Sequence, residues 1–334
     1  MQEGIFGNVK DLRTFCKIPC QTVPLWYNEK GDNSMKKMLF VMNPNAGQRK
    51  AGRSLAQLVG LFNQAGYEVT VFMTAGAGYA TELVRRRAAG ADLVVCCGGD
   101  GTFNETVAGV LSSGAQVPVG YLPAGSTNDF AASLKLPTEL TEAAQVVIRG
   151  QAQPHDVGRF NRRYFTYVAS FGVFTKASYA TPQSLKNTLG HMAYLLEGIQ
   201  ELSQIRREHV RLEPDGYEAL EDDYIFGAVC NATTVGGVLN LDPERVDLAD
   251  GRFELLLIRY PKDLAEVSEC IRALKNQDYS SRMLTFLSTT GVTVTAREDM
   301  TWTLDGEPEQ GHEQIRIQCL HHAIQLIQKG KQDV

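Results

Sequence analysis

Between residues 38 and 149 the sequence alternates apolar runs with amphipathic stretches, and this alternation restricts the fold more than any other feature. Four apolar runs predict strands, at residues 38–42, 68–73, 92–97 and 117–122. Four stretches with apolar side chains at helical spacing predict helices, at residues 49–65, 79–89, 102–111 and 138–149. Gly66 is placed to end the first helix, and Thr138 is placed to cap the last. Regular β-α alternation predicts a parallel sheet that is covered by helices on both faces.

The pattern changes after His155, where strand-like segments follow one another with turns between them. These segments are at residues 155–160, 164–169, 224–231, 252–259, 292–296 and 315–318. Two helices interrupt them, at residues 184–204 and 264–276. We therefore expect an α/β plus β fold, with a Rossmann-like parallel sheet in residues 35–155 and a mainly antiparallel β-sandwich in residues 156–334. The extreme C-terminus is a candidate for return to the first domain.

Charge and cysteine content exclude several classes of protein. A net charge of −5 argues against broad nucleic-acid binding, because phosphate backbones select basic surfaces. Seven cysteines without a C-x-x-C pair predict neither a disulfide framework nor a zinc site, and they fit reduced thiols in a cytosol. No apolar run approaches the roughly 18 residues that span a bilayer. Residues 1–34 lack the apolar core of a signal peptide, and we expect an extension outside the fold that packs on something else, with a second subunit of a homodimer as one candidate.

The third predicted strand runs directly into Gly98-Gly99-Asp100-Gly101 and then into a predicted helix. Glycines let the backbone approach a ligand closely, and the free N–H groups at the start of a helix attract phosphate. Asp100 adds a carboxylate, which is a hard oxygen ligand suited to Mg²⁺. The chain has no G-x-x-x-x-G-K-[ST] sequence, so this would be a phosphate loop without the usual lysine. The simpler alternative is a tight turn between strand and helix.

Two further loops with small and polar residues belong to the same edge of the predicted sheet. Residues 43–47 follow the first strand, and residues 123–130 follow the fourth. In parallel sheets ligands bind beyond the carboxyl ends of the strands, where all three loops fall. Three such loops at one edge favour a ligand site over three unrelated turns.

Three segments, GGDGTFNE at 98–105, PAGSTNDF at 123–130 and LDGEP at 304–308, carry a resemblance to a known family. In this order they resemble the soluble bacterial diacylglycerol kinase family, which is related to sphingosine and ceramide kinases. The likeness runs from about Met35 to the C-terminus. It implies a diacylglycerol kinase catalytic domain that transfers the γ-phosphate of ATP, with Mg²⁺, to a lipid hydroxyl, with diacylglycerol as the first candidate acceptor. It also implies a cytoplasmic enzyme that contacts the inner membrane face transiently, where its lipid substrate lies.

The resemblance also implies roles for individual residues. The nucleotide site would be lined by Asn43, Pro44, Asn45, Ala46, Gly47, Thr74, Gly98, Gly99, Asp100, Gly101, Thr102, Phe103, Asn104 and Ser126. Asp100 would lie near the catalytic Mg²⁺, and Glu307 would be the general base that accepts the proton of the lipid hydroxyl. Without the resemblance, Glu307 is better interpreted as a solvent-facing acid in the acidic stretch 305–309.

A structural Mg²⁺ is also implied by the resemblance. The side chain of Asp250 would bind it, together with the carbonyl oxygens of Asp247 and Arg252. The alternative at Asp250-Gly251 is a hairpin turn. Both interpretations are compatible, because such a turn presents the oxygens.

Access to a lipid requires an apolar entrance. Residues 171–174 and 185–196, with Lys186 and His191, are candidates for an entrance with cationic flanks. The alternative for residues 185–196 is a helix packed on the sandwich.

Two other functions remain as alternatives. One is an NAD kinase, which also has a GGDG loop and two domains; residues 104–105, 126–130 and 305–307 argue against it. The other is a non-catalytic regulator that binds a nucleotide or a lipid, and the presence of both Asp100 and Glu307 argues against that.

Overall fold

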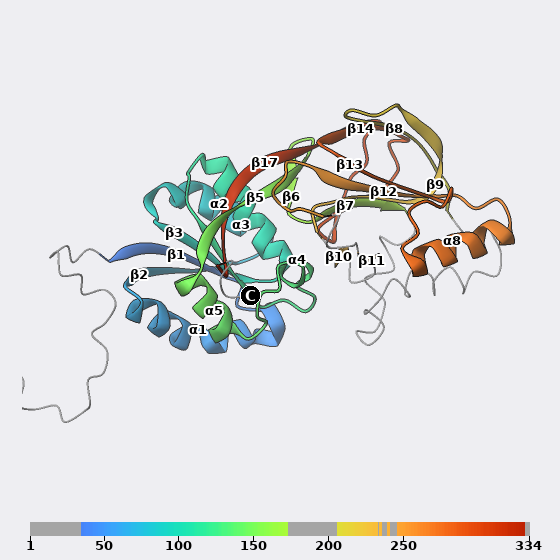
Figure 1. Cartoon of the computed structure of the whole chain (residues 1–334). Coiled ribbons are helices and arrows are strands. Elements are labelled where there is room, and N and C mark those ends of the chain that lie inside the picture. Colours follow the sequence, from blue (N-terminus) through green and yellow to red (C-terminus); the bar gives the residue numbers. More distant parts are fainter. Residues whose placement is uncertain (1–34, 173–205, 233, 236–238, 241–245, 331–334) are drawn as a thin grey trace, which may run out of the picture.

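The computed structural model describes residues 35–172, 206–232, 234–235, 239–240 and 246–330 (Figure 1). Three sequence-based expectations lie outside these residues: the extension at 1–34, the helix at 184–204, and the entrance segments at 173–174 and 185–196.

The first half contains a parallel sheet with the strand order β2-β1-β3-β4. Its strands are β1 (Lys36–Met42), β2 (Tyr67–Met73), β3 (Leu93–Gly98) and β4 (Val119–Pro123). Its helices are α1 (Ala46–Gln64), α2 (Tyr79–Arg87), the 3₁₀ helix η2 (Ala88–Gly90), α3 (Asp100–Ser113), α4 (Asp129–Ser133) and α5 (Leu140–Arg149). Figure 1 shows α1 and α5 on one face of the sheet, with α2 and α3 on the other.

Both faces of this sheet are buried, because alternate residues of a strand point to opposite faces. On β3, Val94 and Cys96 belong to the core that includes α2 and α3. Val95 and Cys97 belong to the core that includes α1 and α5. A strand that is buried on both faces has a continuous apolar sequence, as β3 does. The predicted parallel sheet with helices on both faces is therefore confirmed.

Four local features of the first half differ from the prediction. Helix α1 begins at Ala46, three residues earlier than predicted. The N-cap of α5 is Glu139, whose carboxylate accepts a hydrogen bond from Glu142 N at 2.7 Å, so Thr138 is not the cap. Helix α3 begins at Asp100, two residues earlier than predicted. The loop after β4 contains the five-residue helix α4, which was not predicted. Caps and single turns depend on one side chain each, which is why a periodicity spread over many residues does not locate them.

The second half is mainly antiparallel. Its strands are β5 (Gln151–Phe160), β6 (Arg163–Phe165), β7 (Val168–Gly172), β8 (Glu208–Pro214), β9 (Leu220–Cys230), β12 (Phe253–Arg259), β13 (Leu284–Thr289), β14 (Gly291–Thr295), β15 (Trp302–Leu304), β16 (Glu307–Glu309) and β17 (Gln314–Gln328). The strands β10 (Thr234–Val235) and β11 (Leu239–Asn240) form a separate pair. Helix α8 (Leu264–Asn276) packs Leu274 into the same core as Leu256 of β12. The expected fold class, α/β plus β, is confirmed.

Strand β17 joins the two halves. It pairs antiparallel with β14 and β5, and Leu326 near its end pairs in parallel with Val119 of β4. The C-terminal strand thus returns to the first sheet, and Figure 1 shows β17 and β5 running between the halves.

The core of the second half contains Trp302, whose ring contacts two phenylalanines edge-on. Its centroid lies 5.1 Å from that of Phe160 and 5.0 Å from that of Phe171. Phe171 is only 1% exposed because β7 lies between β9 and β15. The interpretation of Phe171 as part of an apolar entrance is therefore wrong, since its ring fills the core.

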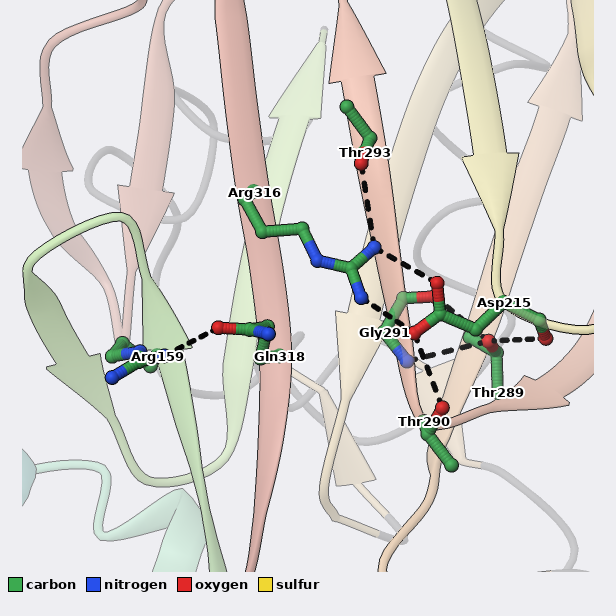
Figure 2. A network of polar contacts seen from close by, with 8 residues as sticks. All are labelled: Arg159, Asp215, Thr289, Thr290, Gly291, Thr293, Arg316 and Gln318. Carbon is green, nitrogen blue, oxygen red and sulfur yellow. Dashed lines mark hydrogen bonds and ion pairs between the residues drawn. The ribbon is translucent and has the colours of Figure 1, made fainter.

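A polar network ties the end of β8 to β14 and β17 (Figure 2). The carboxylate of Asp215 accepts hydrogen bonds from both terminal nitrogens of Arg316, at 2.9 and 2.5 Å, and one from Thr290 Oγ1 at 3.2 Å. Gly291 packs against this pair: an added Cβ would lie 2.9 Å from Asp215 Oδ2 and 2.7 Å from the carbonyl oxygen of Ile317. Any larger residue at position 291 would therefore collide with Asp215 and with the backbone of Ile317.

The substitution Asp215→Asn is expected to lower the free energy of unfolding by at most about 1 kcal/mol at pH 7, because the two side chains are 35% and 38% exposed and water screens the pair. Hydrogen bonds from Arg316 lower the pKa of Asp215. A carboxyl with a lowered folded-state pKa stabilises the protein above its unfolded pKa of about 3.9, and this stabilisation is lost as the pH falls through the folded-state value. Urea unfolding at pH 7 and pH 3 checks this: the difference between variant and wild type should shrink at pH 3, and an equal difference at both would contradict it.

Candidate active site

A cavity of about 900 Å³ lies at the carboxyl edge of the parallel sheet, where the loops after β1, β2, β3 and β4 meet the β15–β16 hairpin. Eleven of the predicted site residues line it: Asn43, Asn45, Ala46, Gly47, Thr74, Gly99, Gly101, Thr102, Asn104, Ser126 and Glu307. The hairpin comes from the second half of the chain, so both halves contribute to the cavity. Four predicted residues do not line it: Pro44, Gly98, Asp100 and Phe103.

Phe103 and Gly98 support the cavity from beneath. Phe103 is fully buried and stacks on Tyr121 and Phe130, with centroid distances of 4.4 and 4.7 Å. An added Cβ on Gly98 would lie 2.6 Å from Thr102 Cβ, so the glycine lets the chain turn tightly from β3 into α3. Both residues therefore have a packing role, and their contact with a nucleotide stays a prediction.

Hydrogen bonds and close backbone contacts hold the loops after β1, β3 and β4 together. Asn43 Nδ2 donates to Thr102 Oγ1 at 3.3 Å, which joins the first loop to α3. Ala124 N donates to the carbonyl oxygen of Gly98 at 2.7 Å. An added Cβ on Gly125 would lie 2.6 Å from Gly99 Cα, so the two backbones are in direct contact. These glycines therefore set the spacing of the loops by close approach.

The substitution Gly125→Ala is expected to push the loop after β4 away from the loop after β3, because the new methyl group meets the backbone of Gly99 and the side chain of Asn128. Overpacking of this kind costs roughly 1–3 kcal/mol of stability. We expect nucleotide affinity to fall at least about 10-fold, since about 1.4 kcal/mol of lost binding energy corresponds to that factor. Calorimetric titration with ATP and Mg²⁺ measures this. Gly60→Ala in α1, where an added Cβ meets nothing within 4 Å, is the matched control and should bind as wild type does.

Asp100 lies at the start of α3, but its carboxylate binds α4. Its Oδ2 accepts a hydrogen bond from Asp129 N at 3.0 Å, and its Oδ1 accepts one from Phe130 N at 3.3 Å. Burial raises the pKa of Asp100 to about 6, although these backbone donors act in the opposite direction. In this arrangement Asp100 positions the loop after β4 against the loop after β3. A role for Asp100 as a magnesium ligand stays a prediction.

Glu105 is a positioning residue to which the sequence assigned no role. Its carboxylate accepts hydrogen bonds from Gly78 N at 2.6 Å and from Ala80 N at 3.0 Å, and so caps the start of α2. Capping side chains usually lie within three residues of the amide they bind. The partners here are 25 and 27 residues away, so no local pattern marks the contact.

The β15–β16 hairpin places Glu307 at the cavity. Asp305 and Gly306 form its two-residue turn with φ values of 49° and 83°, which are typical of a type I′ turn. Glu307 follows as the first residue of β16 and is exposed to the cavity. A Cβ built on Gly101 would lie 3.5 Å from Glu307 Oε1, so this carboxylate lies beside the first turn of α3.

Asp305 anchors this hairpin. Its buried carboxylate accepts five hydrogen bonds: from Thr166 N and Oγ1 at 2.6 and 2.8 Å, Tyr167 N at 2.9 Å, Val168 N at 3.0 Å and Asn104 Nδ2 at 2.5 Å. Burial raises the pKa of Asp305, and the backbone donors oppose that rise. Asp305 thereby links the hairpin to α3, which fixes Glu307 relative to the glycine loop.

Two arginines lie at the cavity rim. Arg162, in the turn between β5 and β6, and Arg163, the first residue of β6, are exposed and line the cavity. Arg163 also forms an ion pair with Glu309. Guanidinium groups suit phosphate oxygens because they present several donors in one plane.

The three residues predicted to hold a structural Mg²⁺ lie together, away from the cavity, in the loop before β12. Asp250 Oδ1 accepts a hydrogen bond from Arg252 N at 2.9 Å, and Gly251 has a φ of 78°, so the predicted turn is present. Glu254 follows, buried, and its Oε2 has no hydrogen-bond partner among the described residues. Burial raises the pKa of Glu254 to about 8, and the charges of Asp250 and Asp247 add to the rise. The structural Mg²⁺ at this turn stays a prediction.

Comparison with known proteins agrees with this architecture. The family model "Diacylglycerol kinase catalytic domain" matches residues 37–160, and "YegS C-terminal NAD kinase beta sandwich-like domain" matches residues 168–328. A solved structure of a putative diacylglycerol kinase from Bacillus anthracis has a TM-score of 0.74 at 22% identity and covers 90% of this chain and 99% of its own. The fold and site therefore define a kinase with a parallel-sheet half and a β-sandwich half.

Curated relatives identify the family. A diacylglycerol kinase from Bacillus subtilis is 35% identical over 279 residues, which cover 82% of this chain and 90% of the relative. Another from Staphylococcus saprophyticus is 29% identical over 274 residues, covering 81% and 89%. The chain belongs to the diacylglycerol kinase family, and the resemblance of its three motifs is confirmed.

Proposed function

We propose that this protein transfers the γ-phosphate of ATP to a lipid hydroxyl, with diacylglycerol as the acceptor and phosphatidic acid as the product. The observation that carries the proposal is the position of Glu307: a hairpin anchored by five hydrogen bonds to Asp305 brings one carboxylate beside the first turn of α3. The names of the curated relatives support diacylglycerol over other lipid alcohols.

The cavity offers positions for both substrates. Phosphate groups suit the start of α3, where backbone N–H groups of a 14-residue helix are not used within the helix. Arg162 and Arg163 at the rim add positive charge for the phosphate oxygens. Mg²⁺, when bound, neutralises the charge that develops on the transferring phosphoryl group.

The chemistry requires one proton transfer and one exchange of P–O bonds. Glu307 accepts the proton of the lipid hydroxyl while that oxygen attacks the γ-phosphorus. The new O–P bond forms as the bond to the bridging oxygen breaks, and ADP leaves with its electron pair. Asp305 and Glu105 act by position, since their carboxylates accept hydrogen bonds from N–H donors of the surrounding loops. Asp100 also holds α4 in place, and its carboxylate keeps accepting capacity with which it would hold Mg²⁺.

The acceptor would be taken from a membrane surface. Among the described residues, no helix is both long enough and apolar enough to cross a bilayer. A lipid alcohol would therefore enter the cavity from the surface of the bilayer during transient contact.

Transfer of label from γ-labelled ATP tests the function. The protein is incubated with Mg²⁺ and a panel of diacylglycerol, sphingosine, monoacylglycerol, phosphatidylglycerol, undecaprenol and NAD. Label in diacylglycerol supports the proposal. Label in another lipid would support a lipid kinase but show that diacylglycerol is not the acceptor. Label in NAD alone, or in none of them despite normal ATP binding, would favour the NAD kinase or the regulator and overturn it.

A further inference from the structure

A second cluster of potential ligands lies where β5, β17 and the loop before β12 meet. Asp156 is on β5, and His321 and His322 are on β17. One ligand atom from each of these three side chains lies within 4.8 Å of the other two. None of the three lines the active-site cavity, so the kinase chemistry leaves the cluster without a role.

An irregularity in β17 brings the two histidines together. Neighbouring residues in a regular strand point to opposite faces. The pairing of β17 with β5 shifts register between Leu320 and Ile324, and His322 has a φ of 51°, which residues other than glycine seldom adopt. As a result, the two ring centroids are only 3.7 Å apart. Both Nε2 atoms donate to one carbonyl oxygen, that of Ala249, at 3.2 Å for His321 and 3.0 Å for His322, so the free lone pair of each neutral ring is on Nδ1.

Asp156 is held rigidly beside the rings. It is fully buried, and its oxygens accept hydrogen bonds from His322 N and Gly251 N, each at 2.6 Å. A carboxylate has about four lone-pair positions, so it keeps accepting capacity beyond these two bonds. Nitrogen and oxygen donors therefore converge on one place.

We propose that Asp156, His321 and His322 bind a divalent transition-metal ion, with zinc as the best fit. Imidazole nitrogens suit zinc, whereas Mg²⁺ is bound through oxygen ligands. The site is therefore distinct in chemistry from the predicted Mg²⁺ site at Asp250. The loop that carries Asp250 only contacts the cluster, through Gly251 N and the carbonyl oxygen of Ala249. The proposal is independent of the lipid kinase function.

Small rotations bring the ligands to bonding distance. Donor atoms at about 2.0–2.1 Å from zinc in a tetrahedral site lie roughly 3.3 Å apart. Both histidines are exposed, so their rings turn without disturbing the core, while Asp156 stays in place. The bound ion would cross-link β5 and β17, the two strands that run between the halves of the protein.

Titration of the full-length protein tests the proposal. Untagged protein, reduced and freed of metal with a chelator, is titrated with ZnCl₂ by calorimetry and with CoCl₂ by visible absorption. We expect one equivalent of each to bind, with the absorption of a four-coordinate Co²⁺ site. His321→Ala and His322→Ala should each weaken binding at least about 10-fold, since loss of supporting residues alone costs that much. His209→Ala on β8, which removes another exposed histidine, should bind as wild type does.

Thermal unfolding provides a second measurement that does not depend on activity. Excess zinc should raise the Tm of the wild type by about 3 °C or more, because an ion that binds only the folded state stabilises it. The rise should vanish in the double variant His321→Ala/His322→Ala. No binding of either metal by the wild type, unchanged binding in both histidine variants, or full displacement of zinc by equimolar Mg²⁺ would each overturn the proposal.

Discussion

Replacing Glu307 with glutamine is expected to reduce the rate of phosphoryl transfer by about 10²–10⁴-fold, the usual contribution of a general base. Glutamine has the same size as glutamate but cannot accept the proton of the lipid hydroxyl at neutral pH. The first turn of α3 and its neighbouring loops are unchanged by the substitution, so the affinity for ATP should stay within about twofold, or roughly 0.4 kcal/mol. Single-turnover transfer of label, with calorimetric titration of ATP, measures both quantities.

Glu313→Gln is the matched control for this experiment. Glu313 is an exposed glutamate just before β17 and does not line the cavity. It should transfer phosphate at the wild-type rate. A Glu307→Gln enzyme that retains full transfer would exclude the general base role. Equal losses of transfer and ATP affinity would instead indicate that Glu307 binds the nucleotide.

Replacing Asp305 with alanine is expected to lower the free energy of unfolding by about 3–5 kcal/mol. The change leaves the N–H groups of residues 166–168 without their acceptor inside the protein, and each buried donor that loses its partner costs about 1–3 kcal/mol. Because Asp305 also binds Asn104, the hairpin loses its link to α3. We therefore expect transfer to fall at least about 10-fold in the folded variant, since small displacements of reacting groups cost rate steeply.

Two measurements separate the effects of Asp305→Ala. Urea unfolding gives the loss of stability, and single-turnover transfer, measured under conditions where the variant is folded, gives the loss of activity. Asp299→Ala is the control, because Asp299 is exposed and pairs only with exposed Arg297 among the described residues, so its loss should change stability by no more than about 0.5 kcal/mol. A second comparison uses the double variant with Glu307→Gln. If Asp305 acts by positioning Glu307, its removal should cost little further activity once Glu307 is gone. A fully additive loss would show that Asp305 acts separately.

Much of the fold could be predicted because its signals are local. The apolar run of β3 and the helical spacing of α1 and α5 reflect burial that repeats every few residues, so each stretch indicates its own structure. The glycine loops could be located for a related reason: glycine at 98, 99 and 101 marks backbone that must turn or come close to another group. The motif order then indicated the family, which the comparisons confirmed.

The prediction was weakest where one side chain decides the structure. Asp100, predicted to lie near the catalytic Mg²⁺, also accepts hydrogen bonds from α4, a helix that local periodicity did not reveal. Phe171 looked like an apolar surface residue, yet its ring fills the core beside Trp302. In both cases the partner lies 29 residues or more away in the chain, so the local sequence held no information about it.

Local patterns were enough to predict the alternating elements of the first half, the antiparallel character of the second and the three loops at one sheet edge, because these depend on neighbouring residues. The long-range contacts emerge only in the folded chain: Glu307 lies beside α3, Asp305 holds it there, and two consecutive histidines of β17 lie near Asp156. These contacts join residues that are more than 130 positions apart. Local periodicity carries no information about such distant partners, so the contacts are seen only in the folded chain.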